Sequence, residues 1–241
     1  MENNLKTNIF DLDKSEIVQI IKDWGEPVFR ADQIWHGIYQ NLWSTPDDFS
    51  NLPLKLREKI FDRFDFTPLK PIAEMKSRDG ETIKTLFSLQ NDAAIEAVLM
   101  MYNRRRTLCI STQVGCGMGC VFCATGQMGF RRHLRRGEIV AQVIYYARWL
   151  KRIDEQVTNV VIMGMGEPFH NYDETLGAVD RLNASDGFNF GARRFTISTV
   201  GLVPMIRRFA LEKRQVNLAI SLHAATNELR SKLLPINKKY P

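Results

Sequence analysis

Residues 158–222 decide the fold, because they contain three short apolar runs: TNVVIM (158–163), RFTIST (194–199) and VNLAISL (216–222). Each run is apolar along its whole length, which is typical of strands buried on both faces of a parallel sheet. Segments with helical spacing of apolar residues are predicted at 137–150, 173–184, 202–213 and 226–234. The alternation of strand and helix predicts an α/β fold around a parallel sheet.

A further strand is predicted directly upstream, at 106–112 (RTLCIST). Counting from Arg106, the chain has about four strand–helix units, whereas a closed barrel of this type needs eight. The expected architecture is therefore an open sheet or a partial (β/α) barrel. Before it, residues 71–112 hold short apolar runs split at Asp79-Gly80 and Asn91-Asp92, which predicts three or four short antiparallel strands.

The N-terminal part is predicted to be helical. Asp13 or Ser15 can cap a first helix that ends before Gly25, a second helix fits residues 30–40, and Pro53 opens a third. We therefore expect three parts: a helical accessory module at 1–65, a β-rich connecting segment at 66–101, and the α/β core at 102–241.

Composition excludes several classes of protein. Of the 241 residues, 44% are hydrophobic and 25% charged, which excludes intrinsic disorder. The net charge of +6 permits a polyanionic partner without requiring one. No apolar run is long enough to cross a bilayer, and the first residues do not resemble a signal peptide, so we expect a cytoplasmic protein with no membrane partner.

All four cysteines lie between Cys109 and Cys123, and Cys116, Cys120 and Cys123 have the spacing C-x3-C-x2-C. Three thiolates on one glycine-rich loop can hold a four-iron cluster and leave one iron open to a small chelating ligand, such as the methionine end of S-adenosylmethionine. A zinc site completed by Cys109 or His133 is one alternative. Surface thiols without a ligand role are another.

Four motifs together identify a family. CGMGCVFC (116–123), GMGEP (164–168), TISTVGLVP (196–204) and ISLHAATNELRSKLLPINKKYP (220–241) stand in this order. The sequence resembles the radical S-adenosylmethionine (SAM) enzymes of the RlmN type, which methylate C2 of an adenine in 23S ribosomal RNA and in transfer RNA. The resemblance implies a partial radical SAM barrel, a [4Fe-4S] cluster on the three cysteines, SAM, both RNAs as partners, and a flavodoxin-like or ferredoxin-like electron donor.

The remaining cofactor contacts are expected where strands end, because chemistry in parallel sheets gathers there. The resemblance implies that the cofactor is bound by Gly166, Glu167, Ser198, Ser221, Leu222 and His223. On the residues alone, Gly166 allows close backbone approach and Glu167 offers a carboxylate to an ammonium group. A plain turn, helix-capping serines and a core histidine are the simpler interpretations.

Two residues outside these motifs are predicted to be catalytic. Cys109 lies in a predicted strand, where a free cysteine is often just a small buried side chain. The resemblance implies instead that it forms a transient disulfide with a second cysteine that carries the methyl group. Glu96 is a lone acid in AAIEAVLMMY (93–102) and matches the proton acceptor of the family. Burial would raise its pKa, and a strand residue facing water is the alternative.

The sequence contains no cysteine after Cys123 that could carry the methyl group. The family also continues for roughly another hundred residues, with further strand–helix units. We therefore expect an N-terminal fragment of an RlmN-type enzyme, inactive on its own.

Arginines cluster around the predicted site. Arg131, Arg132, Arg135 and Arg136 follow the cysteine loop and are predicted to contact RNA phosphates, whereas isolated pairs elsewhere are read as solvated surface. The family resemblance also implies that the helical accessory module at 1–65 helps to bind RNA.

Two other functions stay open. One is a zinc-ordered RNA-binding module without catalysis, and the other is a relative that methylates C8 of the adenine and confers antibiotic resistance. Pro168 favours the C2 type, although Phe169-His170 departs from the aliphatic pair expected of the family at that point.

Overall fold

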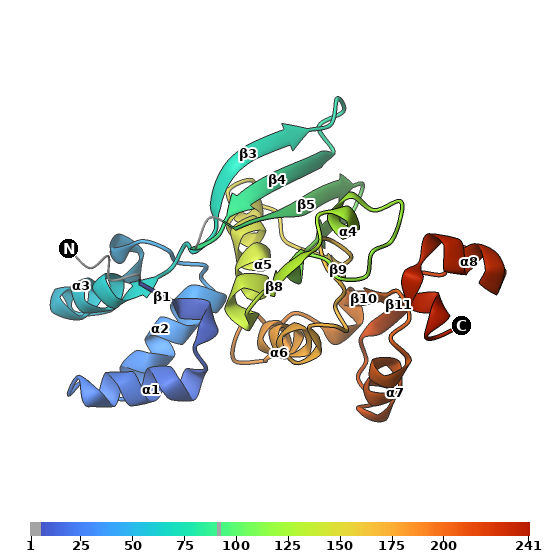
Figure 1. Cartoon of the computed structure of the whole chain (residues 1–241). Coiled ribbons are helices and arrows are strands. Elements are labelled where there is room, and N and C mark those ends of the chain that lie inside the picture. The colour runs from blue at the N-terminus through green and yellow to red at the C-terminus, as the bar shows by residue number, and fades with distance from the viewer. Residues whose placement is uncertain (1–5, 91–92) are drawn as a thin grey trace.

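The computed structural model describes residues 6–90 and 93–241. Its centre is a seven-stranded sheet in the order β11-β10-β9-β6-β5-β4-β3 (Figure 1). The strands are β3 (Lys70–Lys76), β4 (Thr82–Ser88), β5 (Ala94–Tyr102), β6 (Arg105–Cys109), β9 (Asn159–Ile162), β10 (Phe195–Thr199) and β11 (Asn217–Ile220). β3 to β6 pair antiparallel, and β6, β9, β10 and β11 pair parallel. The predicted α/β class and partial barrel are confirmed, with β6 as the strand where pairing changes direction.

Helices follow the parallel strands as predicted. They are α5 (Arg136–Lys151), α6 (Tyr172–Asn183), α7 (Val203–Leu211) and α8 (Asn227–Leu233). α5 packs on the sheet through Tyr146, whose hydroxyl contacts Thr85 Oγ1 at 2.9 Å and the Ala97 carbonyl at 3.0 Å. The opposite face of the sheet carries half-buried side chains such as Cys109 and Ser198. The helices therefore pack on one face of the sheet, and the other face is the candidate location of the functional site.

The N-terminal helices lie beside this core (Figure 1). They are α1 (Lys14–Asp23), α2 (Phe29–Tyr39) and α3 (Leu54–Arg63). Asp13 accepts from the N3 backbone while the Glu16 side chain accepts from the Asp13 backbone, so the predicted cap is confirmed as a capping box. A short parallel pair, β1 (Thr7–Asn8) with β2 (Phe64–Asp65), closes the module.

The middle segment joins the same sheet as the core. The Asp79-Gly80 turn separates β3 from β4 as predicted, whereas Asn91-Asp92 lies outside the described residues. The three-part division of the chain stays a prediction. No helix among the described residues is long and apolar enough to cross a membrane.

Two short elements around the cysteine loop were not predicted. β7 (Gln113–Gly115) pairs antiparallel with β8 (Phe130–His133), and the loop between them contains Cys116, Cys120, Cys123 and the four-residue helix α4 (Ala124–Gln127). This small ribbon fixes both ends of the cysteine loop.

Candidate functional site

The predicted site residues gather around one cavity of about 290 Å³. The cysteine loop forms one wall, and the ends of β9, β10 and β11 form the other. The predicted residues that line it are Cys116, Cys120, Cys123, Gly166, Glu167, Ser198, Ser221 and His223. A larger cavity of about 490 Å³, beside the N-terminal module, contains none of them. The structure thus brings together four segments that are far apart in the sequence.

The cysteine loop depends on glycine at two positions. Gly115 and Gly119 have φ of +72° and +64°, values that residues other than glycine rarely adopt. A Cβ on Gly115 would lie 1.8 Å from the Gly129 carbonyl oxygen, and the Cys116 N–H donates to that same oxygen at 3.0 Å. The close approach of these two backbone segments therefore requires glycine at position 115.

Two of the three thiols, those of Cys116 and Cys120, lie where the neutral form is favoured. Burial raises the pKa of Cys116, and burial together with the neighbouring Cys116 and Cys123 raises the pKa of Cys120 to about 11. A cationic centre is therefore needed to hold them as thiolates. Three thiols open to one cavity with polar groups opposite fit a cluster with one open iron.

A single metal ion fits this set less well. Among residues 6–90 and 93–241, no three His, Cys, Asp or Glu side chains lie close enough together to hold one ion. Cys109 does not line the cavity, so the alternative of a four-cysteine zinc site has no geometric support. A four-iron cube, in contrast, spreads its cysteine ligands over several metal atoms.

Glu167 is buried at the rim of the cavity, with 2% of its surface exposed. Its carboxylate accepts from the Phe169 N–H at 3.0 Å and from the Val200 N–H at 2.9 Å, and burial raises its pKa. The side chain therefore ties the loop after β9 to the loop after β10. The predicted contact with an ammonium group would use the lone pairs that these two bonds leave free.

The other wall residues come from the ends of β10 and β11. The Ser198 and Ser221 hydroxyls lie 2.9 Å apart, and the His223 ring packs 4.8 Å from the Phe122 ring of the cysteine loop. Leu222 does not line the cavity and is 58% exposed. Its predicted cofactor contact stays a prediction.

Cys109 and Glu96 lie outside the cavity lining. Cys109 pairs with Val98 across the β5–β6 ladder, and burial raises the pKa of its thiol. The Glu96 side chain is 42% exposed and pairs with Lys84 Nζ at 3.0 Å, so it is not the buried acid considered from the sequence. Both roles stay predictions.

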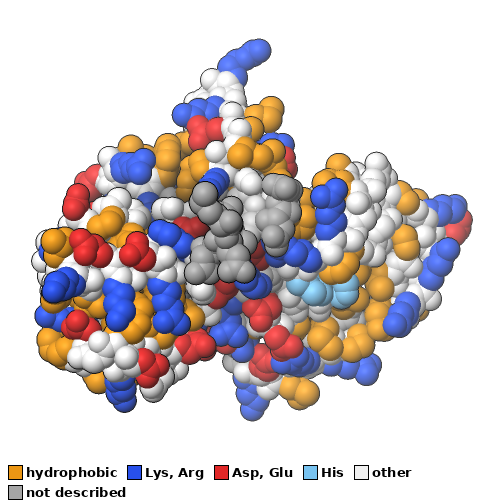
Figure 2. Space-filling model, turned by 60° about the vertical axis from the view of Figure 1, so that its left-hand side comes forward, with side chains coloured by type: hydrophobic (Ala, Val, Ile, Leu, Met, Phe, Trp, Pro, Cys, Tyr) orange, Lys and Arg blue, Asp and Glu red, His pale blue; other side chains and the backbone are white. Residues whose placement is uncertain are grey.

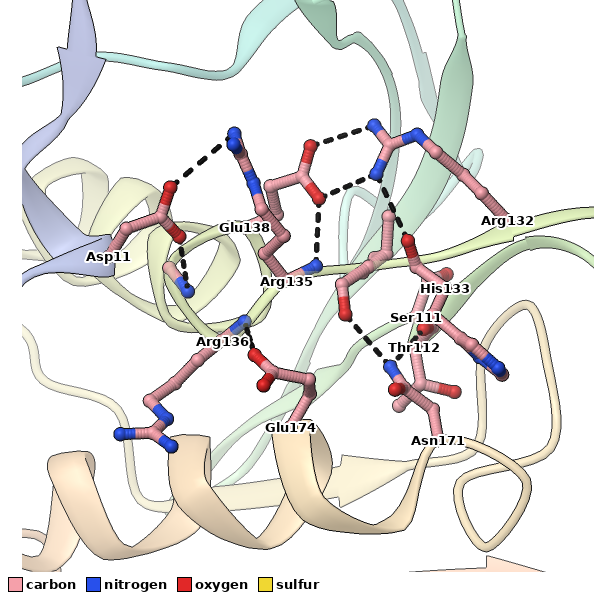
Figure 3. Close-up of polar contacts among 12 residues, drawn as sticks. Asp11, Ser111, Thr112, Arg132, His133, Arg135, Arg136, Glu138, Asn171 and Glu174 are labelled. Atoms are coloured by element: carbon pink, nitrogen blue, oxygen red, sulfur yellow. Dashed lines mark hydrogen bonds and ion pairs between the residues drawn. The ribbon is translucent and has the colours of Figure 1, made fainter.

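The arginines after the cysteine loop are largely engaged within the chain (Figure 3). Arg132 contacts both carboxylate oxygens of the buried Glu138, at 2.7 and 2.8 Å. Arg135 pairs with Asp11 at 3.4 Å and Arg136 with Asp13 at 3.5 Å, which links this segment to the N-terminal module. Figure 2 likewise shows Lys and Arg side chains interspersed with Asp and Glu. Predicted RNA contacts from these three arginines would compete with their carboxylate partners.

Family models match most of the chain. A model described as the radical SAM superfamily matches residues 110–241, and one described as the ribosomal RNA large subunit methyltransferase N-terminal domain matches residues 7–64. The chain belongs to the RlmN-type radical SAM methyltransferase family. The resemblance stated from four motifs is therefore confirmed.

Individual relatives agree with this membership. Probable dual-specificity RNA methyltransferases RlmN from Chloroflexus aurantiacus and Geobacillus kaustophilus are 48% and 47% identical, each over 97% of this chain. The crystal structure of a radical SAM methyltransferase from Sphaerobacter thermophilus matches with a TM-score of 0.93 and 48% identity over 98% of this chain. The chain spans 63% of the Chloroflexus relative, 64% of the Geobacillus relative and 69% of the solved chain.

Sequence reasoning missed a polar cluster that the RlmN-type fold places behind the cavity wall. Gln113 of β7 contacts His133 of β8 and His170 of the loop after β9, each at 3.1 Å. The one signal in the sequence was the unusual Phe169-His170 pair. Gln113 itself carries no recognisable pattern, because a glutamine is acceptable at almost any strand position.

Proposed function

We propose that this protein acts in radical SAM methylation of RNA, at C2 of an adenine in 23S ribosomal RNA and in transfer RNA. The observation that carries the proposal is the single cavity shared by Cys116, Cys120, Cys123 and the ends of three parallel strands. The relatives' name as RNA methyltransferases supports RNA as the substrate class. RNA substrates in turn support a cytoplasmic location.

The residues divide into two binding groups. The three cysteines would hold the [4Fe-4S] cluster, and Gly166, Glu167, Ser198, Ser221, Leu222 and His223 would hold SAM. When bound, the cluster supplies the electron, received from a flavodoxin-like or ferredoxin-like donor, with which SAM is cleaved to a carbon radical. A radical is needed because C2 of adenine is not nucleophilic and would not accept a methyl group by polar transfer.

Two further residues would act on the RNA intermediate. Glu96 would take the proton from the adenine, with Lys84 beside it to balance its charge. Cys109 would close a disulfide with the methyl-carrying cysteine and so release the product. The 241 residues contain no cysteine after Cys123, so we propose that these residues alone bind both cofactors without completing methyl transfer.

Anaerobic reconstitution tests the proposal. The wild-type chain should bind about four irons and four sulfides, and Cys116→Ser, Cys120→Ser and Cys123→Ser should each lose most of them. Cys109→Ser is the matched control and should keep the cluster, because Cys109 does not line the cavity. A wild-type chain that binds zinc but no sulfide would overturn the proposal.

The site of methylation needs a separate measurement. Mass spectrometry of RNA treated with a chain that includes a late cysteine should find 2-methyladenosine. Finding 8-methyladenosine would instead assign the protein to the C8-methylating relatives.

A further inference from the structure

Gln113 is fully buried, and its side-chain amide joins three groups from different elements. Its Oε1 accepts from the backbone N–H of Glu167 at 2.9 Å. Its Nε2 lies 3.1 Å from His133 Nδ1 and 3.1 Å from His170 Nδ1. Every polar atom of this amide therefore has a partner.

The chemistry of these partners fixes the protonation of both rings. A backbone N–H can only donate, so the atom of Gln113 that faces Glu167 must be the carbonyl oxygen. The other atom is then the NH₂ group, which donates two hydrogen bonds. Both histidines must accept at Nδ1, so both rings are neutral and carry their proton on Nε2.

The same glutamine also packs against the backbone of the cavity wall. Gly166 has φ of +101°, and a Cβ there would lie 2.6 Å from the Gln113 Cβ. The backbone N–H groups of Thr112 and Gln113 both donate to the Met165 carbonyl, at 2.8 and 3.2 Å. Gln113 therefore touches three consecutive residues of the loop that enters the cavity, and it stands three residues before Cys116.

We propose that Gln113, held by His133 and His170, is the positioning residue that sets the Gly166–Glu167 segment in place for the methionine end of SAM. This inference rests on the proposed function. A proton added to Nδ1 of either ring would face the NH₂ group donor to donor. The amide would then have to turn and present its NH₂ to the Glu167 N–H, which breaks the contact with the loop.

The surroundings of His133 favour its neutral form. The two rings lie 4.9 Å apart, and burial together with the neighbouring His170 lowers the pKa of His133. Phe130 packs against both rings at 4.9 and 5.4 Å. The charged groups nearby are Arg132, which donates to the His133 carbonyl and is neutralised by Glu138, and the buried Glu167 beyond the amide.

The first test needs no cofactor. In the full chain labelled with ¹⁵N-histidine, long-range NMR correlations at pH 7.5 should show His133 and His170 protonated on Nε2 alone. His36 and His223 serve as internal references, since neither is hydrogen-bonded to Gln113. A proton on Nδ1 of either ring in the network would overturn the proposal.

The second test measures equilibrium binding of SAM to the anaerobically reconstituted chain between pH 6 and pH 8. Gln113→Met should weaken binding at least tenfold at every pH. Gln113→Glu should bind SAM at least threefold more tightly at pH 6 than at pH 8, because protonated rings donate to the carboxylate from Nδ1 without the change of tautomer that neutral rings would need. The wild type should bind SAM less tightly at pH 6 than at pH 8. Gln156→Glu, an exposed change remote from the cavity, should follow the wild type.

Three outcomes of this test are distinct. Unchanged binding by Gln113→Met, or identical pH profiles for Gln113→Glu and the wild type, would overturn the positioning role. Thermal unfolding of each variant identifies any that fails to fold. If a Gln113 variant fails, His170→Leu is measured in its place. His170→Leu removes one acceptor and should weaken SAM binding by a smaller factor. A wild-type chain that binds no SAM would contradict the proposed function, while the NMR result would still test the network.

Discussion

Gly115 and Gly129 have the same φ of +72° but different surroundings. A Cβ at Gly129 meets no atom within 4 Å, whereas one at Gly115 meets the Gly129 carbonyl oxygen. Gly129→Ala should therefore cost about 1 kcal/mol for the left-handed conformation alone. Gly115→Ala should cost at least about 3 kcal/mol, because the β7–β8 ribbon must also separate. Urea unfolding of the two variants checks this, and equal losses would contradict it.

The lowered pKa of His133 makes stability depend on pH near neutrality. A histidine in the unfolded chain has a pKa near 6.5, and His133 binds its proton less readily once folded. The unfolded state therefore gains its proton first as the pH falls. The stability that His133 contributes by staying neutral is present above pH 6.5 and is lost as the pH falls below it. The free energy of unfolding should decrease from pH 7.5 to pH 6 in the wild type. His133→Asn should flatten that slope, and an unchanged slope would assign the effect to other groups.

At this scale the sequence singles out the three cysteines that line the cavity, but not the residues that support it. C-x3-C-x2-C has a chemical meaning of its own, so Cys116, Cys120 and Cys123 could be chosen without a structure. The burial of Glu167 on two backbone N–H groups and the exposure of Glu96 depend on neighbours from distant strands. No local pattern contains that information.

Among the elements, α5 connects the N-terminal module to the sheet, and its Arg148 makes several of the contacts. Arg148 donates to three backbone carbonyls, those of Leu42 at 3.0 Å, Trp43 at 2.7 Å and Phe66 at 2.7 Å. Burial lowers the pKa of its guanidinium to about 10, which still leaves it charged at neutral pH. The three carbonyls lie on the chain leaving α2 and the chain following α3.

Arg148→Met should lower the free energy of unfolding by about 2–4 kcal/mol, because it removes charged donors and leaves three carbonyls with one partner fewer. Arg152→Met, at an exposed position on the same helix end, should cost less than about 0.5 kcal/mol. Chemical denaturation of both variants provides the comparison. A small loss for Arg148→Met would show that its three carbonyl contacts contribute little to holding the module.

Helices and parallel strands were predicted to within a few residues because their apolar spacing is regular. The predicted helix 137–150 is α5 (Arg136–Lys151), and the predicted strand 158–163 is β9 (Asn159–Ile162). β7 and β8 were missed, since strands of three and four residues are too short to show a period. Their pairing follows from the close approach of Gly115 and Gly129.

For the molecule as a whole, the proposed RNA binding and the net charge of +6 together predict an affinity that depends on salt. Arg131 is exposed and has no carboxylate partner among the residues that the structure describes, whereas Arg132 is paired with Glu138. Arg131→Ala should weaken binding of a short single-stranded RNA and reduce the salt slope by about 0.7. Arg132→Ala should chiefly lower stability. Fluorescence anisotropy at 50–300 mM KCl separates the two, and equal slopes for both variants would contradict the assignment.

The change from antiparallel to parallel pairing at β6 has a consequence for the order in which the protein folds. β3 to β6 pair with their neighbours in sequence, whereas the first parallel pair joins Thr107 to Asn159 across a connection that contains the β7–β8 ribbon and α5. Hairpins form in microseconds, while distant pairs must first overcome the entropy of loop closure. The antiparallel half can thus assemble first and present β6 as the template for the rest. Leu108→Ala in β6 should slow refolding in stopped-flow experiments, whereas Leu218→Ala in β11 should mainly accelerate unfolding.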